Sequence, residues 1–588
     1  MSELITLTII FSERRPNRIQ CLAEMVADVN HPQYGGHLNR AELDSLVALP
    51  EEERRGVIEW LAGLGMKVID PLYGNKQLLF VSATTEQIKA AFGEESFCWM
   101  NRNGDHRGAR IASALPRRLA GYVQKVSGLF NQRLRTGNLI ANSAALETAA
   151  AMARETGRLR RTAPLASPLP PDDLGGFTPA EIREIYQFPD EWDGSGETIA
   201  LMLLGGDLRN ADLQTFWRAH GVERDRASVT QIGAARGGRT NSLHALEAAM
   251  TVEWVGAMAP GAKIAVYHID PALVSDPWSA FLLAVIGDKE HNPTVACTTW
   301  VTPERRYYGP HGHSVITGLL NQCAALGVTV VSAAGDWGAF DGIPRTIRDG
   351  RYVSDAPWPH GVFPAVEERV LAVGGTMITN RRPLTETAWS GPPPPGAQQA
   401  IHFDRIAGSG GFSDNVPIPA WQEPVLRSHY PRGAGRPSVA PYGRGFPDVA
   451  LMAAGPAIQR KSGEGLSSQS YQAVVGGQWI DYAGGTSIAA PVWAAIIARA
   501  NQARRAAGLP RVGFVNPLLY QLQNATPAPF RQITIGAADV AMTVVNRHGQ
   551  AVTYDLPGYE CRDGWDPVTG LGVPNVTNLI ELLRRRRR

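Results

Sequence analysis

The sequence has little of what marks several common classes of protein. Its five cysteines are odd in number, widely spaced and without a Cys-x-x-Cys pair, which argues against a disulfide framework and a zinc site. Basic residues outnumber acidic ones by only two, 57 against 55, so no net charge attracts nucleic acid or an anionic surface. The longest apolar run, residues 488–498, is too short to span a bilayer. We therefore expect no nucleic-acid partner and no membrane partner.

The N-terminus lacks a recognisable export signal. No basic segment followed by a long apolar core occurs in the first residues, MSELITLTIIFSERRPNR. We therefore predict no secretory leader, and the localisation stays open.

The first 150 residues indicate a small α+β unit. Apolar patterns predict strands at residues 4–11 and 77–81, and helical periodicity predicts helices at 40–49, 51–64 and 85–92. Residues 151–176 follow, and the four prolines and two final glycines between 162 and 176 do not suit a helix or a strand. We interpret 151–176 as an exposed linker, the kind of segment in which proteases cut.

The pattern changes at Phe177, where short apolar runs begin to alternate with helical segments. Such runs are typical of parallel strands that are covered on both faces. Strands are predicted at 198–204, 263–269, 294–299, 329–333 and 370–373, and helices at 242–258 and 315–326. Residues 177–588 are therefore predicted to form an α/β domain with a doubly wound parallel sheet, whose sites lie at the carboxyl ends of the strands.

One segment, GGTSIAAP at residues 484–491, places Ser487 at the start of a long apolar helix. Small residues before the serine let a substrate backbone approach closely. The first turn of a helix offers unpaired N–H groups and a positive dipole end, which would stabilise a developing oxyanion. The alternative is an ordinary Ser/Thr helix cap, but a cap needs neither the two preceding glycines nor the proline at 491. The segment therefore indicates a nucleophile.

Two acidic residues could complete such a site. Asp336 lies in the segment SAAGDWG, residues 332–338, directly after a predicted strand. Glu247 lies on a predicted helix whose other residues are largely apolar, so its carboxyl group is expected to be partly buried. Taken alone, a turn aspartate and a solvated helix glutamate would be the simpler interpretations.

The ordered set of these segments resembles the sedolisin family of serine-carboxyl peptidases, in its kumamolisin-like branch, along nearly the whole chain. Residues 31–35 (HPQYG) resemble the activation prodomain of that family. Residues 177–179 (FTP) and 186–189 (YQFP) resemble the start of the mature enzyme. Further matches are found at 408–413 (GSGGFS), 419–422 (PAWQ) and 564–572 (GWDPVTGLG).

The resemblance implies a subtilisin-like fold and an endopeptidase that works at acidic pH, made as an autoinhibited proenzyme. Residues 1–150 would be the activation and inhibitory prodomain, and 177–588 the peptidase domain. Ser487 would be the nucleophile, Glu247 its general base, and Asp336 a protonated acid in the oxyanion hole. The partners would be a peptide or protein substrate and the chain's own prodomain, and members of the family usually work outside the cell.

Two positions depart from the pattern of the family. Thr251 stands where the family has an aspartate four residues after the glutamate, on the same helix face. Leu203 stands where kumamolisin-like enzymes have a glutamate at the end of the first mature strand. A threonine hydroxyl can donate a hydrogen bond to Glu247 but cannot hold a charge. A second hypothesis follows, a catalytically impaired pseudopeptidase or peptide-binding scaffold on the same fold.

The resemblance also implies one calcium ion near the C-terminus. Asp566, Ile533 and Gly564 match positions of this metal site. Gln532 replaces the first aspartate ligand of the family, and Arg562 replaces a glycine whose carbonyl binds the ion. Calcium is a hard cation that prefers anionic oxygen ligands, so we predict weak calcium binding.

Overall fold

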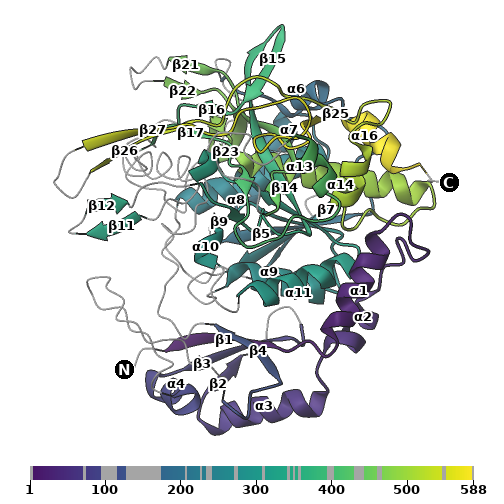
Figure 1. The fold of residues 1–588 in the computed structure, drawn as a ribbon, viewed down its shortest axis with the longest axis vertical. Coiled ribbons are helices and arrows are strands. Elements are labelled where there is room, and N and C mark those ends of the chain that lie inside the picture. The colour runs from purple at the N-terminus through teal and green to yellow at the C-terminus, as the bar shows by residue number, and fades with distance from the viewer. Residues whose placement is uncertain are drawn as a thin grey trace.

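A computed structural model of the chain confirms the predicted α/β class. Figure 1 shows a large α/β body and a smaller N-terminal lobe below it. The structure describes residues 4–69, 75–93, 116–127, 174–205, 208–224, 228–233, 242–269, 276–307, 312–340, 345–348, 351–354, 359–393, 403–429, 443–459, 466–545 and 551–585. Nearly all of the predicted linker 151–176 lies outside these residues. No helix among the described residues is long and apolar enough to cross a membrane.

A central eight-stranded sheet organises the large body. Its order is β15-β14-β10-β8-β5-β7-β6, with β20 paired to β14, and all pairs except β14–β15 are parallel. The strand bounds are β5 Thr198–Leu204, β6 Val229–Ile232, β7 Lys263–Ile269, β8 Val295–Thr298, β10 Thr329–Ala333, β14 Val370–Arg381, β15 Leu384–Ala388 and β20 Val449–Ala454.

Helices cover both faces of this sheet. Helices α9 (Pro277–Gly287) and α11 (Gly312–Ala325) pack on one face, and α8 (Ser242–Met258) and α14 (Thr486–Ala506) pack on the other. Alternate residues of β5 divide between the two apolar cores, as a pleated strand requires. Ile199, Leu201 and Leu203 join the core on the side of α8 and α14, while Ala200 and Met202 join the core beneath α9 and α11.

The predicted strands agree closely with the observed ones, but one strand is longer than predicted, and β6, β15 and β20 of the central sheet were not predicted. The strand predicted at 370–373 continues to Arg381, because its polar second half pairs antiparallel with β15 and leaves the buried part of the sheet. Strand β20 was not predicted, although it is buried along its whole length and pairs in parallel with β14. The helix predicted at 242–258 is α8, and the helix predicted at 315–326 is α11, which begins three residues earlier.

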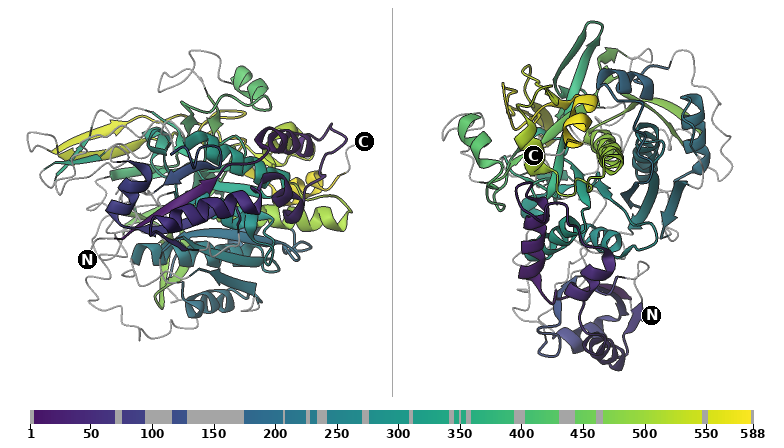
Figure 2. Two further views of the ribbon diagram at one scale, coloured as in Figure 1. Left: turned by 90° about the horizontal axis from the view of Figure 1, so that it is seen from below. Right: turned by 90° about the vertical axis from the view of Figure 1, so that its right-hand side faces the viewer.

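The N-terminal lobe contains an antiparallel sheet of order β2-β3-β1-β4. Its strands are β1 Ile5–Phe11, β2 Lys67–Ile69, β3 Leu78–Ala83 and β4 Val123–Ser127, and its helices are α1 Pro16–Ala27, α2 Arg40–Val47, α3 Glu51–Gly63 and α4 Thr85–Phe92. Figure 2 shows this lobe in purple, with α1 and α2 reaching up against the large body. The α+β unit predicted from the sequence is therefore present.

The lobe contacts the large body mainly through α9 and α11. Helix α1 packs along α11. The buried Arg40 guanidinium donates to the carbonyls of Val285 and Pro293 at 3.0 and 3.1 Å. Lys125 forms a 2.8 Å ion pair with Asp276, the N-cap residue of α9. Polar side chains of the lobe therefore bind backbone and side-chain groups of the large body directly.

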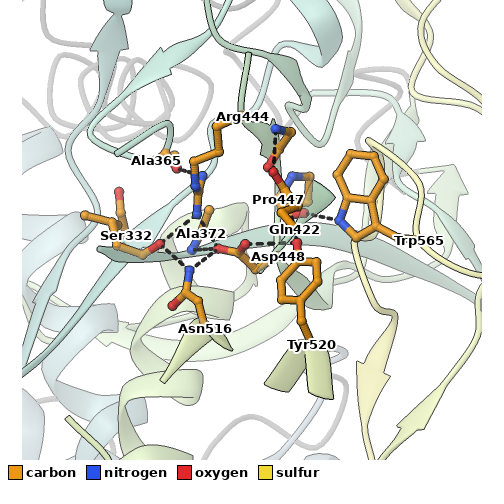
Figure 3. A network of polar contacts seen from close by, with 12 residues as sticks. Ser332, Ala365, Ala372, Gln422, Arg444, Pro447, Asp448, Asn516, Tyr520 and Trp565 are labelled. Carbon is orange, nitrogen blue, oxygen red and sulfur yellow. Dashed lines mark hydrogen bonds and ion pairs between the residues drawn. The ribbon is translucent and has the colours of Figure 1, made fainter. Parts of the chain in front are cut away.

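A buried polar network lies beside the carboxylate of Asp448, just before β20 (Figure 3). Arg444, which is fully buried, forms a 2.7 Å ion pair with Asp448 and donates to the carbonyl of Val370 at 2.9 Å. Asn516 and Tyr520 donate to the same carboxylate at 3.0 and 3.1 Å. The network joins the loop before β14 to helix α15 (Asn516–Leu522).

Candidate active site

Ser487 lies at the N-terminus of α14, as predicted. It is the second helical residue, and Gly485 before the helix has a φ of +88°, a conformation that favours glycine. A Cβ at Gly484 would lie 2.5 Å from the carbonyl oxygen of Ala453, so this position also requires glycine. The two glycines let the chain turn sharply from β24 (Gln478–Ala483) into the helix. The turn presents Ser487 among backbone N–H groups that lack helical partners.

Asp336 lies on the loop after β10 and is attached to the start of the same helix. Both the backbone N–H and the hydroxyl of Thr486 donate to Oδ1 of Asp336 at 2.9 Å. The side chain is 3% exposed. Burial raises the pKa of Asp336 to about 6, although the hydrogen bonds from Thr486 act in the opposite direction. A carboxyl group with such a pKa can hold a proton at mildly acidic pH.

The glycine-rich segment at 408–411 forms hydrogen bonds with the loop that carries Asp336. The N–H of Ser409 donates to the carbonyl of Gly335 at 2.9 Å, and the N–H of Trp337 donates to the hydroxyl of Ser409 at 2.9 Å. A Cβ at Gly410 would lie 1.8 Å from the carbonyl oxygen of Pro567. The segment therefore holds both neighbours of Asp336 in place and requires glycine for close packing.

Glu247 lies on α8, which packs along α14, and its side chain is 3% exposed. Burial raises the pKa of Glu247 to about 8, and the nearby charge of Asp336 adds to the increase. The hydroxyls of Thr299 and Ser487 lower the pKa of Glu247 as hydrogen-bonding neighbours. Ser487, Glu247 and Asp336, which are far apart in the sequence, therefore act on one another in one buried site.

The contacts of the glutamate are loose. Oε1 of Glu247 has no hydrogen-bond partner in the described part of the chain, and neither has the hydroxyl of Thr299. The Thr299 hydroxyl thus approaches the carboxyl group without completing a short, well-directed hydrogen bond. Catalytic hydrogen bonds are often long before substrate binds and tighten in the complex with substrate.

Thr251 does not take over the role of the missing aspartate. Its side chain is buried one turn after Glu247, but the Thr251 hydroxyl has no hydrogen-bond partner among the residues described. The expected hydrogen bond to Glu247 is therefore absent. Leu203 is buried in the apolar core on the side of α8 and α14, where it brings no charge or hydrogen bond to the site.

Sequence reasoning missed Thr299. This residue immediately follows β8 and is 3% exposed. The signal available was its place at the carboxyl end of a predicted parallel strand, where the sites of α/β sheets lie. A single threonine among many carries no motif, so only the fold shows that its hydroxyl faces Glu247.

The predicted calcium site does not have the groups that the ion needs. Asp566 is fully buried, and both of its carboxylate oxygens already accept hydrogen bonds, from the N–H groups of Arg562, Val568 and Thr569 at 2.8 to 3.0 Å. The amide of Gln532 donates to the carbonyl of Leu571 at 3.0 Å.

The other predicted ligands add no charge to this site. Ile533 and Gly564 offer at most backbone carbonyls, and the described residues contain no group of three or more His, Cys, Asp or Glu side chains suited to a metal ion. A single carboxylate whose oxygens are already occupied is a poor ligand set for calcium.

The arrangement suits acyl transfer. A serine hydroxyl at a helix N-terminus lies near a carboxyl group that can accept its proton, and a second carboxyl group lies near enough to influence the first. The pKa values of Glu247 and Asp336, about 8 and about 6, are raised and set apart by burial, so the pair carries one proton between these pH values.

Two protein-family descriptions match the chain. Residues 1–132 match the description "Pro-kumamolisin, activation domain", and residues 219–549, more than half of the chain, match "Subtilase family". The first match covers the N-terminal lobe, and the second covers most of the central sheet together with Glu247, Asp336 and Ser487.

Known relatives align along nearly the whole chain. Kumamolisin of Bacillus sp. (strain MN-32) is 29% identical over 586 residues, which cover 98% of this chain and 91% of the relative. Tripeptidyl-peptidase 1 of Bos taurus is 26% identical over 600 residues, which cover 99% of this chain and 92% of the relative. A solved structure of Pseudomonas sedolisin, a serine-carboxyl proteinase complexed with two molecules of pseudo-iodotyrostatin, has the same fold. Its TM-score is 0.51 at 23% identity, and the match covers 70% of this chain and 98% of that chain.

Proposed function

This chain belongs to the subtilase family and is a serine-carboxyl peptidase of the sedolisin type with a kumamolisin-like activation domain, and we propose that Ser487, Glu247 and Asp336 carry its reaction. In this proposal Ser487 is the nucleophile, Glu247 the general base and Asp336 the oxyanion donor. The observation that supports it most is that the hydroxyl of Ser487 and the charge of Asp336 both change the pKa of Glu247.

The first half of the proposed reaction forms an acyl-enzyme. The Ser487 oxygen attacks the carbonyl carbon of the substrate peptide bond while its proton passes to the Glu247 carboxylate. The substrate oxygen becomes an oxyanion, which accepts a hydrogen bond from protonated Asp336 and from backbone N–H groups at the start of α14. The intermediate collapses when Glu247 returns the proton to the leaving amine.

The second half reverses these roles. Water enters, Glu247 takes its proton, and the hydroxide attacks the acyl carbon. The same oxyanion donors stabilise the second intermediate, and its collapse returns the proton to the Ser487 oxygen as the acid product leaves. We propose that the enzyme cleaves within peptide chains, as the resemblance to the kumamolisin-like branch implies.

The number of protons on the carboxyl groups of Glu247 and Asp336 sets the pH range in which the site can work. The reaction needs Glu247 ionised and Asp336 protonated, so the pair must carry one proton. Loss of that proton removes the oxyanion donor, and gain of a second removes the base. Burial gives Asp336 a pKa of about 6 and Glu247 a pKa of about 8, so the pair carries one proton between these values. That proton rests mainly on Glu247, and we propose that the reaction uses the less populated form in which it has passed to Asp336.

The N-terminal lobe is proposed to inhibit the peptidase until the linker 151–176 is cut. Its contacts with α9 and α11, such as the Lys125–Asp276 ion pair, support a stable docked form. Peptide substrates and the lobe itself are then the partners. The occupied oxygens of Asp566 support a fold that does not depend on calcium in this region.

The proposal is tested with the full-length protein incubated at pH 5.5 to 6.5. The wild-type chain should release its N-terminal lobe and cleave an unstructured peptide, while Ser487→Ala stays intact and Glu247→Gln loses turnover. Ser428→Ala serves as a matched control, because Ser428 lies on α13 (Glu423–His429), away from the site, and only donates to the carbonyl of Val425. Cleavage by Ser487→Ala at the wild-type rate would refute the assignment of the nucleophile.

The pseudopeptidase hypothesis predicts a different result. Thr251 and Leu203 bring no acid to Glu247, which is the observation that favours it. In that case the wild-type chain would bind peptides but cleave none, and Ser487→Ala would bind them equally well. Calorimetry with a non-cleaved peptide distinguishes this outcome from an unfolded or inaccessible site.

A further inference from the structure

A general base must be held in one orientation, and the residue expected to hold Glu247 does not do so. The hydroxyl of Thr251 makes no hydrogen bond with any described residue. Leu203 is apolar. The orienting group must therefore come from another element that faces the Glu247 carboxyl group.

Strand β8 supplies a candidate at its carboxyl end. Side chains alternate along a strand, so Val295, Cys297 and Thr299 share one face. Val295 and Cys297 belong to the core on the side of α8 and α14, and α14 packs directly on β8. Thr299 therefore faces the two helices that carry Glu247 and Ser487. The charge of Glu247 also raises the pKa of Cys297, which agrees with a carboxyl group above this face.

The Thr299 hydroxyl is buried and has no hydrogen-bond partner among the residues that the structure describes. Within the same described ranges, Oε1 of Glu247 is likewise buried without a partner. Two complementary unsatisfied groups in one enclosed site are strongly driven to pair once the carboxyl group is ionised, because an unpaired buried polar group is costly.

We propose that Thr299 is the positioning residue for Glu247, and that its hydroxyl donates to the Glu247 carboxylate in the role that the family gives to an acid at position 251. A neutral donor orients the carboxylate and stabilises its charge. An ionised acidic side chain in the same place would instead repel the Glu247 carboxylate. This inference rests on the proposed function of Glu247 as the base.

The test compares four variants of the full-length protein. Thr299→Val removes the hydroxyl at nearly constant volume, and Thr299→Ser restores it. Thr251→Val removes the hydroxyl at the position that the family uses. Thr294→Val is the matched control, because Thr294 precedes the amino end of β8, and its hydroxyl contacts the carbonyl of Thr198 at 3.4 Å and the side chain of Glu197, not Glu247.

We expect Thr299→Val to lower kcat about tenfold to a hundredfold with KM nearly unchanged, the effect of losing one hydrogen bond to a charged group. The Thr299 hydroxyl lowers the pKa of Glu247, so its loss should move the basic limb of the pH profile, which lies at the pKa of Glu247 near 8, to higher pH. Thr299→Ser should recover most of both effects, while Thr294→Val behaves like the wild-type protein. A larger loss in Thr251→Val than in Thr299→Val, or an unmoved basic limb, would overturn the proposal.

A second measurement keeps this test separate from the proposed function. The carboxyl carbon of Glu247 can be titrated by NMR in a glutamate-labelled chain and assigned with Glu247→Gln. Thr299→Val should raise the measured pKa of Glu247 even in a Ser487→Ala background that cleaves nothing. If Thr299→Val leaves the pKa of Glu247 unchanged in this background, Thr299 does not position Glu247. If Thr299→Val raises that pKa but the wild-type chain cleaves no peptide, only the proposed reaction is wrong.

Discussion

Thr486 holds Asp336 by two hydrogen bonds from one residue, with its backbone N–H and its hydroxyl both 2.9 Å from Oδ1. The residue before the nucleophile thereby fixes the Oδ1 oxygen of the acid. The same hydroxyl accepts from the N–H of Gly335 at 3.1 Å. The relative position of Asp336 and Ser487 is thus set by the backbone at the start of α14.

The first prediction concerns pH. Between the pKa values of about 6 and about 8 the carboxyl pair carries one proton, and outside this range it carries two or none. We expect kcat/KM of the processed enzyme to be bell-shaped, rising through about pH 6 and falling through about pH 8. A stopped assay on a short peptide across pH 3 to 9 measures this. A profile that rises steadily toward pH 3 would show that Glu247 is ionised far below its expected range.

The second prediction assigns the acidic and basic limbs of the pH profile to individual groups. Asp336→Asn keeps an oxygen that can accept from Thr486 and an amide donor that does not lose its proton. The basic limb should therefore disappear. The remaining acidic limb should report Glu247 alone, so it moves from about pH 6 toward the pKa of Glu247, which the loss of the Asp336 charge lowers from about 8. Asp336→Ala, which has no donor, should lower kcat by about a hundredfold to a thousandfold. A basic limb that persists in Asp336→Asn would assign it to another group.

The third prediction concerns release of the N-terminal lobe. His37 packs against Gly327 and Gly513, where an added Cβ would lie within 2.5 and 2.8 Å of its ring. Burial, with the Arg511 and Arg504 guanidiniums beside it, lowers the pKa of His37 from 6.5 to about 4. The docked lobe therefore favours neutral His37. The contribution of His37 to docking is therefore fully present above about pH 6.5 and is lost as the pH falls toward 4.

Lobe release followed by gel filtration tests this in a Ser487→Ala background whose linker has been cut by an added protease. Release should become about tenfold or more faster between pH 6.5 and pH 5, and His37→Gln should remove most of that dependence, whereas His31→Gln in the same segment should retain it. Glu13 opposes the effect, because burial raises its pKa at the same interface. A wild-type lobe that stays docked equally well at both pH values would contradict the role of His37.

The fourth prediction concerns stability. Arg444 and Asp448 form a fully buried ion pair, and removal of one partner leaves the other charge uncompensated. Arg444→Met should lower the free energy of unfolding by about 3 to 5 kcal/mol. Arg427→Met, which breaks the exposed pair with Glu423, should cost less than about 1 kcal/mol. Denaturant unfolding of both variants in the Ser487→Ala background checks this, and equal losses would contradict it.

The fifth prediction concerns calcium. Because backbone N–H groups already occupy both oxygens of Asp566, a chelator should leave the thermal midpoint within about 1 °C of its untreated value. Asp566→Ala should lower the midpoint by several degrees, since it leaves those N–H groups unpaired. A rise of the midpoint on calcium addition would show that the ion displaces these hydrogen bonds.

Much of the fold was predictable because periodicity is a local property. Residues 85–92 form the predicted helix, and residues 198–204 form the predicted strand. Strand β20 was missed because its residues 449–454 lie among glycines and prolines and pair only with the distant β14. The second half of β14 was missed because polar residues there face β15 outside the core.

For the site, the residue types and the ends of the elements at which they stand could be read from the sequence. It identified Ser487 at a helix start, Asp336 after a strand and Glu247 on an apolar helix, because glycine turns and helix starts are local features. Only the tertiary structure decided which hydroxyl faces the glutamate. A spacing of four residues places Thr251 and Glu247 on the same side of α8 without bringing their polar atoms together. The approach of Thr299 depends on how β8, α8 and α14 pack, and no local pattern contains that information.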